Sequence, residues 1–108
     1  MSKTNGSKSA AKKGHRGHCL LRLFIAGNGL NSRTALANLH SICKEYLNGH
    51  STIETIDVVK DFQAAIRDNI LVTPALLMVT PRPKVMVLGN LSDRPKVLAA
   101  LRLSERKS

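Results

Sequence analysis

The sequence predicts a single α/β domain whose elements follow the order βαβαββα. Three observations support this fold class. Residues 19–26 (CLLRLFIA) form a short apolar run that ends at a glycine, as a strand buried on both faces does. Apolar residues then recur at helical spacing to about residue 47. A Thr-Pro pair at Thr73-Pro74 opens a second half with two more short apolar runs.

The first half reads as a strand, a helix, a strand and a short helix. Asn31 or Ser32 is the expected cap of the first helix, whose apolar positions are Leu36, Leu39, Ile42 and Tyr46. Residues 48–49 (NG) are expected to end it. Residues 52–58 (TIETIDV) alternate as a strand does, and Asp61 is the expected cap of a helix that reaches about residue 69.

The second half reads as two strands and a helix. Residues 75–79 (ALLMV) and 84–88 (KVMVL) are the strands, and the rigid turn Pro81-Arg82-Pro83 joins them. Ser92 is the expected cap of the last helix, with Pro95 in the first turn, where its missing N–H is tolerated. Its apolar stripe is Val97, Leu98 and Leu101.

The position of Thr73-Pro74 makes the predicted sheet thioredoxin-like. A proline at the mouth of an apolar strand, after a βαβ unit, is typical of that fold, and we expect a cis bond there because X–Pro bonds tolerate cis. Redox members face this proline with a catalytic cysteine pair. The matching turn, residues 27–32 (GNGLNS), contains no sulfur. The fold signal is therefore present without the redox motif, which favours a binding or regulatory module.

The length and the charge of the chain limit the number of domains and the classes of function that it can have. The 108 residues suffice for one domain, which we place at residues 19–104, with a short tail at 105–108. The net charge is +10, and residues 1–18 carry five basic residues and no acidic one, which predicts a disordered basic tail. No apolar run has membrane-spanning length, and Cys19 and Cys43 lie in apolar runs. We expect a cytoplasmic protein.

No catalytic, cofactor or metal site is expected. Gly27-x-Gly29 lacks the third glycine of a dinucleotide fingerprint and is interpreted as a tight turn. His15 and His18 beside Cys19 match no zinc spacing. Asp57 is either a buried acid or, more simply, a hydrogen-bond acceptor in a turn. No nucleophile, base and acid can be placed together, so we do not expect an enzyme.

Several blocks of the sequence resemble the KaiB family. Residues 23–28 (LFIAGN) are similar to its L-Y-V-A-G-N, and residues 56–58 (IDV) to its I-D-V. Residues 70–76 (ILVTPAL) resemble its second half, and residues 89–98 (GNLSDRPKVL) resemble G-D-L-S-D-R-E-K-V-L. The ordered set covers about residues 19–103 without gaps, so it is more specific than any one block.

This resemblance implies a regulator without a catalytic site that binds the ring of a KaiC-type ATPase and modulates its phosphorylation cycle. KaiB proteins are also similar to a thioredoxin-like sensor domain of a clock histidine kinase. The family has two folds, a tetramer-forming one and a thioredoxin-like one, that differ from about Leu71 onward. The residues that we expect to matter for this switch are Thr73, Pro74, Gly89, Asn90, Ala100 and Arg102.

The last two of these residues depart from the family's Gly-Leu-Asp. Alanine is favoured over glycine in a helix by roughly 1 kcal/mol. A cation near a helix C-terminus gains roughly 0.3–1 kcal/mol from the dipole. Ala100 and Arg102 therefore favour a C-terminal helix, and we expect the chain to rest in, or easily reach, the thioredoxin-like state.

Other departures rewrite the expected partner surface. The family's Asn-Pro after the second strand is Asp61-Phe62 here, and its acidic pair before Asp68 is Ile66-Arg67. The partner is accordingly a KaiC-like ATPase or a signalling kinase, and the oligomeric state is left open between monomer, dimer and tetramer. The candidate contact residues are the basic ones that adjoin the motifs: Arg33, Lys60, Arg67, Lys84 and Arg94.

Two further classes remain as alternatives. A thiol oxidoreductase requires an activated thiolate, which the turn at residues 27–32 does not supply. A nucleic-acid-binding protein would use the basic tail, and its binding would weaken steeply with salt.

Overall fold

The computed structural model describes residues 18–103 and has the predicted order of elements. Along the chain it contains β2 (Cys19–Ile25), α2 (Leu30–Ile42), the π-helical turn η1 (Cys43–Leu47), β3 (Ser51–Asp57), α3 (Phe62–Arg67), β4 (Ala75–Thr80), β5 (Val85–Leu88) and α4 (Arg94–Ala100). The expected basic tail, apart from His18, and the expected C-terminal tail at 105–108 lie outside the described residues.

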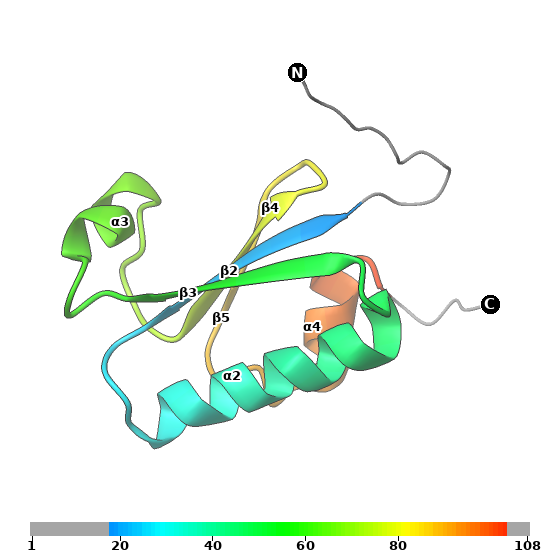
Figure 1. Ribbon diagram of the computed structural model, residues 1–108, viewed down its shortest axis with the longest axis horizontal. Helices are drawn as coiled ribbons and strands as arrows, with labels where there is room; N and C mark the ends of the chain where they lie inside the picture. The colour runs from blue at the N-terminus through cyan, green and yellow to red at the C-terminus, as the bar shows by residue number, and fades with distance from the viewer. Residues whose placement is uncertain (1–17, 104–108) are drawn as a thin grey trace.

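The four strands form one mixed sheet in the order β3-β2-β4-β5 (Figure 1). β2 and β3 are parallel, with Cys19 opposite Ser51 and Ile25 opposite Asp57. β4 is antiparallel to β2 and to β5, with Ala75 opposite both Phe24 and Leu88. A parallel pair requires a crossover, which α2 supplies, whereas β4 and β5 are joined by a tight turn. This is the predicted thioredoxin-like arrangement.

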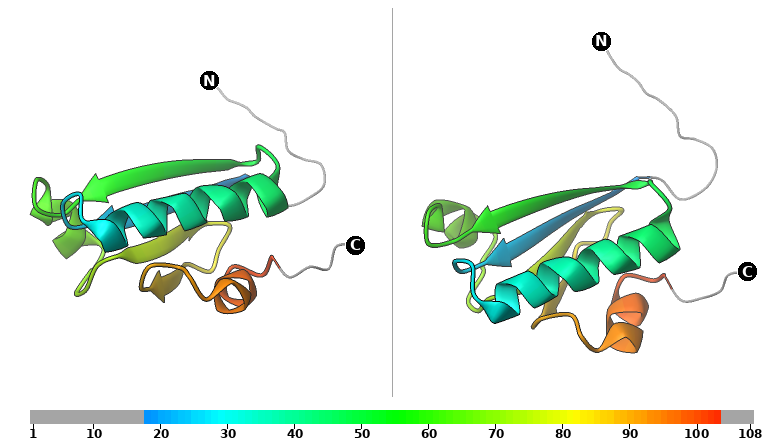
Figure 2. Two further views of the ribbon diagram at one scale, coloured as in Figure 1. Left: turned by 90° about the horizontal axis from the view of Figure 1, so that it is seen from below. Right: turned by 60° about the horizontal axis from the view of Figure 1, so that its bottom comes forward.

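The main core lies between the sheet and the helices α2 and α4, which cover the same face (Figure 2). Alternate residues of β2, among them Leu21 and Leu23, are fully buried there. They pack in one cluster with Leu39 of α2 and Val97 of α4. Each fully buried side chain of this kind contributes about 1.5–3 kcal/mol. The expected stripe of the last helix is confirmed, since Val97 and Leu101 are buried and Leu98 packs against them.

A smaller core lies on the opposite face, beneath α3. Phe24 is its one fully buried large side chain, and Ala64, Ala75 and Leu77 are the other buried members of the cluster. Asp61 caps α3 as predicted, since its Oδ1 accepts a 3.2 Å hydrogen bond from the Ala64 N–H. Because α3 has six residues and buries two alanines, it covers this face only in part.

Two predicted helix caps are wrong. The residue that caps α2 is Gly29, while Asn31 and Ser32 already lie within the helix, and Ser32 is buried. α4 begins at Arg94, so its cap is Asp93, whose side chain accepts a hydrogen bond from the Lys96 N–H. Ser92 lies one residue too early, and its own N–H donates to Asn90 Oδ1 in the preceding turn.

The predicted inward position of Tyr46 is also wrong. Its side chain is 37% exposed, whereas Leu47 is buried. The prediction assumed α-helical spacing to residue 47, but residues Cys43–Leu47 form a π-helical turn with more residues per turn. Because the wider turn contains more residues, the side chain that faces the core is that of Leu47 rather than that of Tyr46. The helix ends where predicted, because Asn48 adopts the left-handed conformation.

Candidate interaction surface

Four connections meet at one end of the sheet, which we call the loop end. β2 and β3 are parallel and finish together at Ile25 and Asp57. β4 starts and β5 finishes beside them, since Ala75 lies opposite both Phe24 and Leu88. The loop end therefore consists of residues 26–29, 58–61, 70–74 and 89–93, and it contains the turn in which redox relatives would carry their cysteine pair.

Asp57 connects two of these loops. Its Oδ1 accepts hydrogen bonds of 3.0 Å from the Gly27 N–H and 3.0 Å from the Val59 N–H. Gly27 has φ +74°, a conformation that glycine adopts without the Cβ penalty. The two backbone donors lower the pKa of Asp57, and the positive charge of Lys60 lowers it further. Asp57 is thus a turn acceptor, the simpler of its two predicted roles, and Gly27-x-Gly29 belongs to a tight turn.

Thr73, Pro74, Gly89 and Asn90 come together in the other half of the loop end. The Thr73–Pro74 peptide bond is cis. The Pro74 carbonyl accepts a 2.9 Å hydrogen bond from the Gly89 N–H. The Asn90 carbonyl accepts one of 2.9 Å from Asn38 Nδ2 of α2. These bonds fix the residues before β4 and after β5 against each other and against α2.

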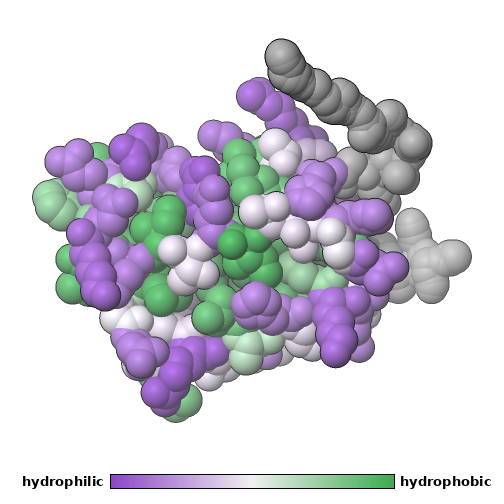
Figure 3. All heavy atoms as spheres, in the orientation of Figure 1, coloured by the Kyte–Doolittle hydropathy of each residue, from purple (hydrophilic) through white to green (hydrophobic). Residues whose placement is uncertain are grey.

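The loop end concentrates exposed apolar side chains. Six of the nine large hydrophobic residues that are exposed in the described part of the chain lie in these loops or directly beside them, and we name them the loop-end surface: Leu30, Val59, Phe62, Leu71, Val72 and Leu88. Leu71 is 92% exposed. In Figure 3, apolar atoms appear among hydrophilic ones at the left, where Figure 1 places this end and α3. Clustered apolar exposure of this kind marks interaction sites in soluble proteins.

The sequence-based choice of site residues missed this surface. The prediction named basic residues only and left out the exposed apolar residues of α3 and of the loops before and after it. A signal was available in residues 62–66 (FQAAI), where two large apolar residues stand four apart on one helical face with two alanines between them. That spacing places Phe62 and Ile66 on the opposite side of α3 from Ala64 and Ala65.

The structure does not gather the five basic candidates on one face. Arg33, in the first turns of α2, and Lys60, after β3, are exposed at the loop end. Arg67 is exposed at the far end of α3. Lys84 lies in the turn between β4 and β5, at the opposite end of the sheet, because Thr80 pairs with Leu20 near the start of β2. These four remain candidates as separate surface cations.

Arg94 is engaged within the molecule. Its Nη2 donates a 2.7 Å hydrogen bond to Ser41 Oγ, and its Nη1 forms an ion pair with Glu45 Oε1. Both partners lie in the helical segment that α2 and η1 form. Arg94 thus tethers α4 to that segment, and its part in a partner contact stays a prediction.

Ala100 and Arg102 lie at the end of α4, apart from the other expected switch residues. Ala100 is the last helical residue, and Arg102 has φ +57°. Arg102 lies beside Cys19 and Pro81, at the end of the sheet opposite the loop end. These two residues therefore belong to the end of the C-terminal helix and lie away from the loop-end surface, and their part in a fold switch stays a prediction.

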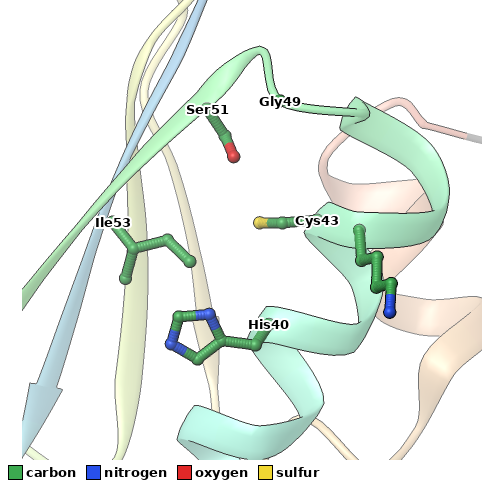
Figure 4. Close-up of a pocket in the computed structure, with 6 residues that line it drawn as sticks. His40, Cys43, Gly49, Ser51 and Ile53 are labelled. Carbon is green, nitrogen blue, oxygen red and sulfur yellow. The ribbon is translucent and has the colours of Figure 1, made fainter.

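Cys43 faces a shallow recess on the far side of the molecule from α3. The recess, of about 410 Å³, lies between α2, η1 and the start of β3, and His40, Ser51 and Ile53 also line it (Figure 4). Burial raises the pKa of the Cys43 thiol, and a hydrogen bond with the Ser51 side chain partly offsets this. Among residues 18–103, no three His, Cys, Asp or Glu side chains are grouped so that they could hold a metal ion.

Neither cysteine belongs to the loop end. Cys19 begins β2 and Cys43 begins η1, both are buried, and they form no disulfide. Within the described part of the chain, no helix is both long and apolar enough to span a bilayer.

Solved structures share the fold of this chain at low sequence identity. The N-terminal domain of SasA from Synechococcus elongatus superposes with a TM-score of 0.67 at 20% identity, covering 92% of this chain and 97% of that domain. Chloroplastic thioredoxin z superposes with a TM-score of 0.65 at 16% identity, covering 82% of this chain and 80% of that one. At these identities the likeness shows the thioredoxin-like fold alone.

Sequence comparison is more specific. The model of the KaiB domain matches residues 22–103. The circadian clock oscillator protein KaiB of Microcystis aeruginosa is 45% identical over 84 residues, which are 78% of this chain and 81% of that protein. The circadian clock protein KaiB3 of Synechocystis sp. is 40% identical over 82 residues, covering 76% and 80%. Together with the thioredoxin-like sheet and the ordered motifs, these matches show that the chain belongs to the KaiB family.

Proposed function

We propose that this chain is a non-enzymatic regulatory module of the cytoplasm that binds a KaiC-type ATPase and modulates its phosphorylation and ATPase cycle. The observation that carries the proposal is the loop-end surface, six large apolar side chains at the end of the sheet where a redox relative would carry cysteines. Family membership supports a KaiC-type ATPase as the partner.

The surface supports binding for a simple energetic reason. Apolar area removed from water contributes about 25 cal/mol per Å². Leu71, at 92% exposure, and Val59, at 71%, gain almost nothing from the fold itself, so their burial is available to a partner. The loops that present them are fixed by Asp57 and by the Pro74–Gly89 hydrogen bond, so less conformational entropy is lost on binding.

The state of the two cysteines supports the non-enzymatic part of the proposal, as far as thiol exchange is concerned. Thiol exchange needs an accessible thiolate. Cys43 is buried with a raised pKa, and Cys19 is buried in the first strand. At the loop end, Asp57 is already used as an acceptor for two backbone N–H groups.

A signalling kinase is a second candidate partner. The resemblance of KaiB proteins to a thioredoxin-like sensor domain of a clock histidine kinase suggests it, and the superposition on the N-terminal domain of SasA adds only that the fold is shared. The two candidates differ in the partner and share the surface.

Size-exclusion chromatography with light scattering tests the proposal. The purified chain is mixed with the KaiC-type ATPase of its source organism and ATP, and we expect it to co-elute with the ring. Leu71→Asn should weaken binding about tenfold or more, while Tyr46→Ser, at an exposed position in η1 away from the loop end, should bind as the wild type does. Separate elution of the wild type, under conditions in which a clock KaiB binds its own ring, contradicts the proposal. The same experiment with purified kinase domains then decides the second candidate.

A further inference from the structure

The helix α3 packs in the reverse of the usual sense. Its two small residues, Ala64 and Ala65, are 4% and 8% exposed, whereas its two largest, Phe62 and Ile66, are 60% and 65% exposed. An amphipathic helix normally buries its large apolar side chains. α3 therefore approaches the sheet closely through alanines and presents the side chains with the greatest hydrophobic gain to solvent.

The exposed side chains form one continuous helical face. Phe62 and Ile66 are four residues apart, so they are neighbours on the surface of α3. Arg67 follows Ile66 at the edge of this face, is exposed, and makes no ion pair within the described residues. We call Phe62, Ile66 and Arg67 the α3 face.

The acidic residues around α3 are already engaged. Asp68 and Glu54 both bind Arg22, and Asp57 accepts from two backbone N–H groups. Asp61 is exposed, but its Oδ1 accepts the capping hydrogen bond from Ala64. Within α3 itself, Arg67 is the one charged residue, and its cation makes no ion pair among the described residues.

Charge decides between two occupants of this face. A second copy of the chain would bring two molecules of net charge +10 together and, across a two-fold axis, one Arg67 near the other. A partner with carboxylates around an apolar groove would pair with Arg67 and bury Phe62 and Ile66. Opposite charge at the rim also accelerates association.

We propose that the α3 face is the specificity-determining contact of this module and that it docks into an apolar groove bordered by Asp or Glu side chains on the partner protein. The inference rests on the proposed function, because the groove is placed on the ATPase ring. Beyond the proposed function, the inference specifies an apolar groove with a carboxylate rim on the ring and names the three residues of the α3 face that bind it.

Binding of the full chain to the source organism's ATPase ring, measured by biolayer interferometry with ATP at low and high NaCl, tests this inference. Two variants probe the face: Phe62→Ser with Ile66→Ser, and Arg67→Glu. Two controls match them: Tyr46→Ser for a lost exposed apolar group, and Lys96→Glu for a reversed exposed charge outside the face. Because all five substituted residues are exposed, circular dichroism should show wild-type folding in every variant.

We expect the double variant to bind at least about thirtyfold more weakly, as for a central hot spot. Arg67→Glu should bind at least about fivefold more weakly, with a flatter salt dependence, and both controls should stay within about twofold of the wild type. Wild-type affinity in the double variant overturns the inference while leaving the proposed function intact. Failure of the wild type itself to bind the ring overturns the proposed function and this inference together.

Sedimentation of the chain alone completes the test. A dimer that the double variant converts to a monomer would assign the α3 face to self-association and overturn the acidic-partner proposal. A wild type whose oligomeric state is unchanged in the double variant supports it.

Discussion

Arg22 Nη1 donates a 2.9 Å hydrogen bond to Asp68 Oδ2 and so ties the C-cap of α3 to the central strand β2. The same guanidinium donates from Nε to Glu54 Oε1 at 2.8 Å. The Arg22 side chain is 24% exposed and that of Asp68 is 14% exposed. Because α3 buries little apolar area of its own, this partly buried ion pair holds the helix in place and thereby sets the position of the α3 face.

Asp68→Asn should therefore destabilise the fold more than Glu54→Gln does. We expect Asp68→Asn to lower the free energy of unfolding by about 1–2 kcal/mol, because it weakens a charge-assisted bond in a site with little water. The Glu54 side chain is 43% exposed, so Glu54→Gln should cost about 0.5 kcal/mol or less. Urea unfolding at neutral pH measures both values, and equal losses would show that α3 is not held by this pair.

The lowered pKa of Asp57 predicts acid sensitivity. The Gly27 and Val59 N–H groups stabilise the carboxylate in the folded state, so the unfolded state binds the proton more readily. This contribution is complete above the ordinary pKa of about 3.9 and is lost as the pH falls through the lower folded-state value. Urea midpoints of the wild type and Asp57→Asn at pH 6 and pH 2.5 test it. The wild type should exceed the variant at pH 6, and the difference should shrink at pH 2.5. A constant difference would mean that the carboxylate charge is not involved.

The elements of this fold were predictable because each carries a local signal. The alternation of residues 52–58, the Asp61 cap and the cis-tolerant Thr73-Pro74 pair all act over a few residues. The errors arose where the outcome depends on neighbours. Ser92 and Asp93 are both good N-cap residues, and the Asn90 side chain decides between them by binding the Ser92 N–H. Tyr46 was misplaced because nothing local distinguishes a π-helical turn from an α-helical one.

The candidate site was harder to predict than the fold, because exposure is a tertiary property. Phe62 and Ile66 were recognised as departures from the family pattern, but an apolar residue in a sequence normally suggests a core position. Only the close approach of Ala64 and Ala65 to the sheet shows that both large side chains face solvent. Arg94 is the opposite case, because its sequence neighbours do not show that the side chain has partners within the molecule. Its guanidinium pairs with Glu45 and donates a hydrogen bond to Ser41, and both residues lie about fifty positions earlier in the chain.

The Cys43 thiol should react slowly in the native protein. Burial raises its pKa and leaves less thiolate at a given pH, and the side chain is only 6% exposed beside the recess. In a Cys19→Ala variant, we expect Cys43 to react with Ellman's reagent at pH 8 at least about a hundredfold more slowly than free cysteine. The same variant in 6 M guanidinium chloride is the control and should react at the free-thiol rate. A native rate equal to the unfolded one would place Cys43 at an open surface and reopen the thiol-exchange alternative.

Arg102 occupies a backbone position that normally suits glycine. Its φ is +57°, its N–H donates to the Ala99 carbonyl, and the Leu103 N–H donates to the Leu98 carbonyl. These residues therefore form a Schellman motif that ends α4.

A side chain in the left-handed region costs about 1–2 kcal/mol, which glycine avoids. Comparison of Arg102→Gly with Arg102→Ala isolates this cost, because both variants remove the same charge. Allowing for the greater entropy of glycine in the unfolded chain, we expect Arg102→Gly to unfold with a free energy about 1 kcal/mol higher than Arg102→Ala. In a continuous helix or a strand the order would reverse, because alanine is favoured over glycine there. Urea unfolding that ranks the alanine variant above the glycine variant would therefore show that residues 97–103 do not end as a capped helix in solution, and it would favour the second fold that the family resemblance implies.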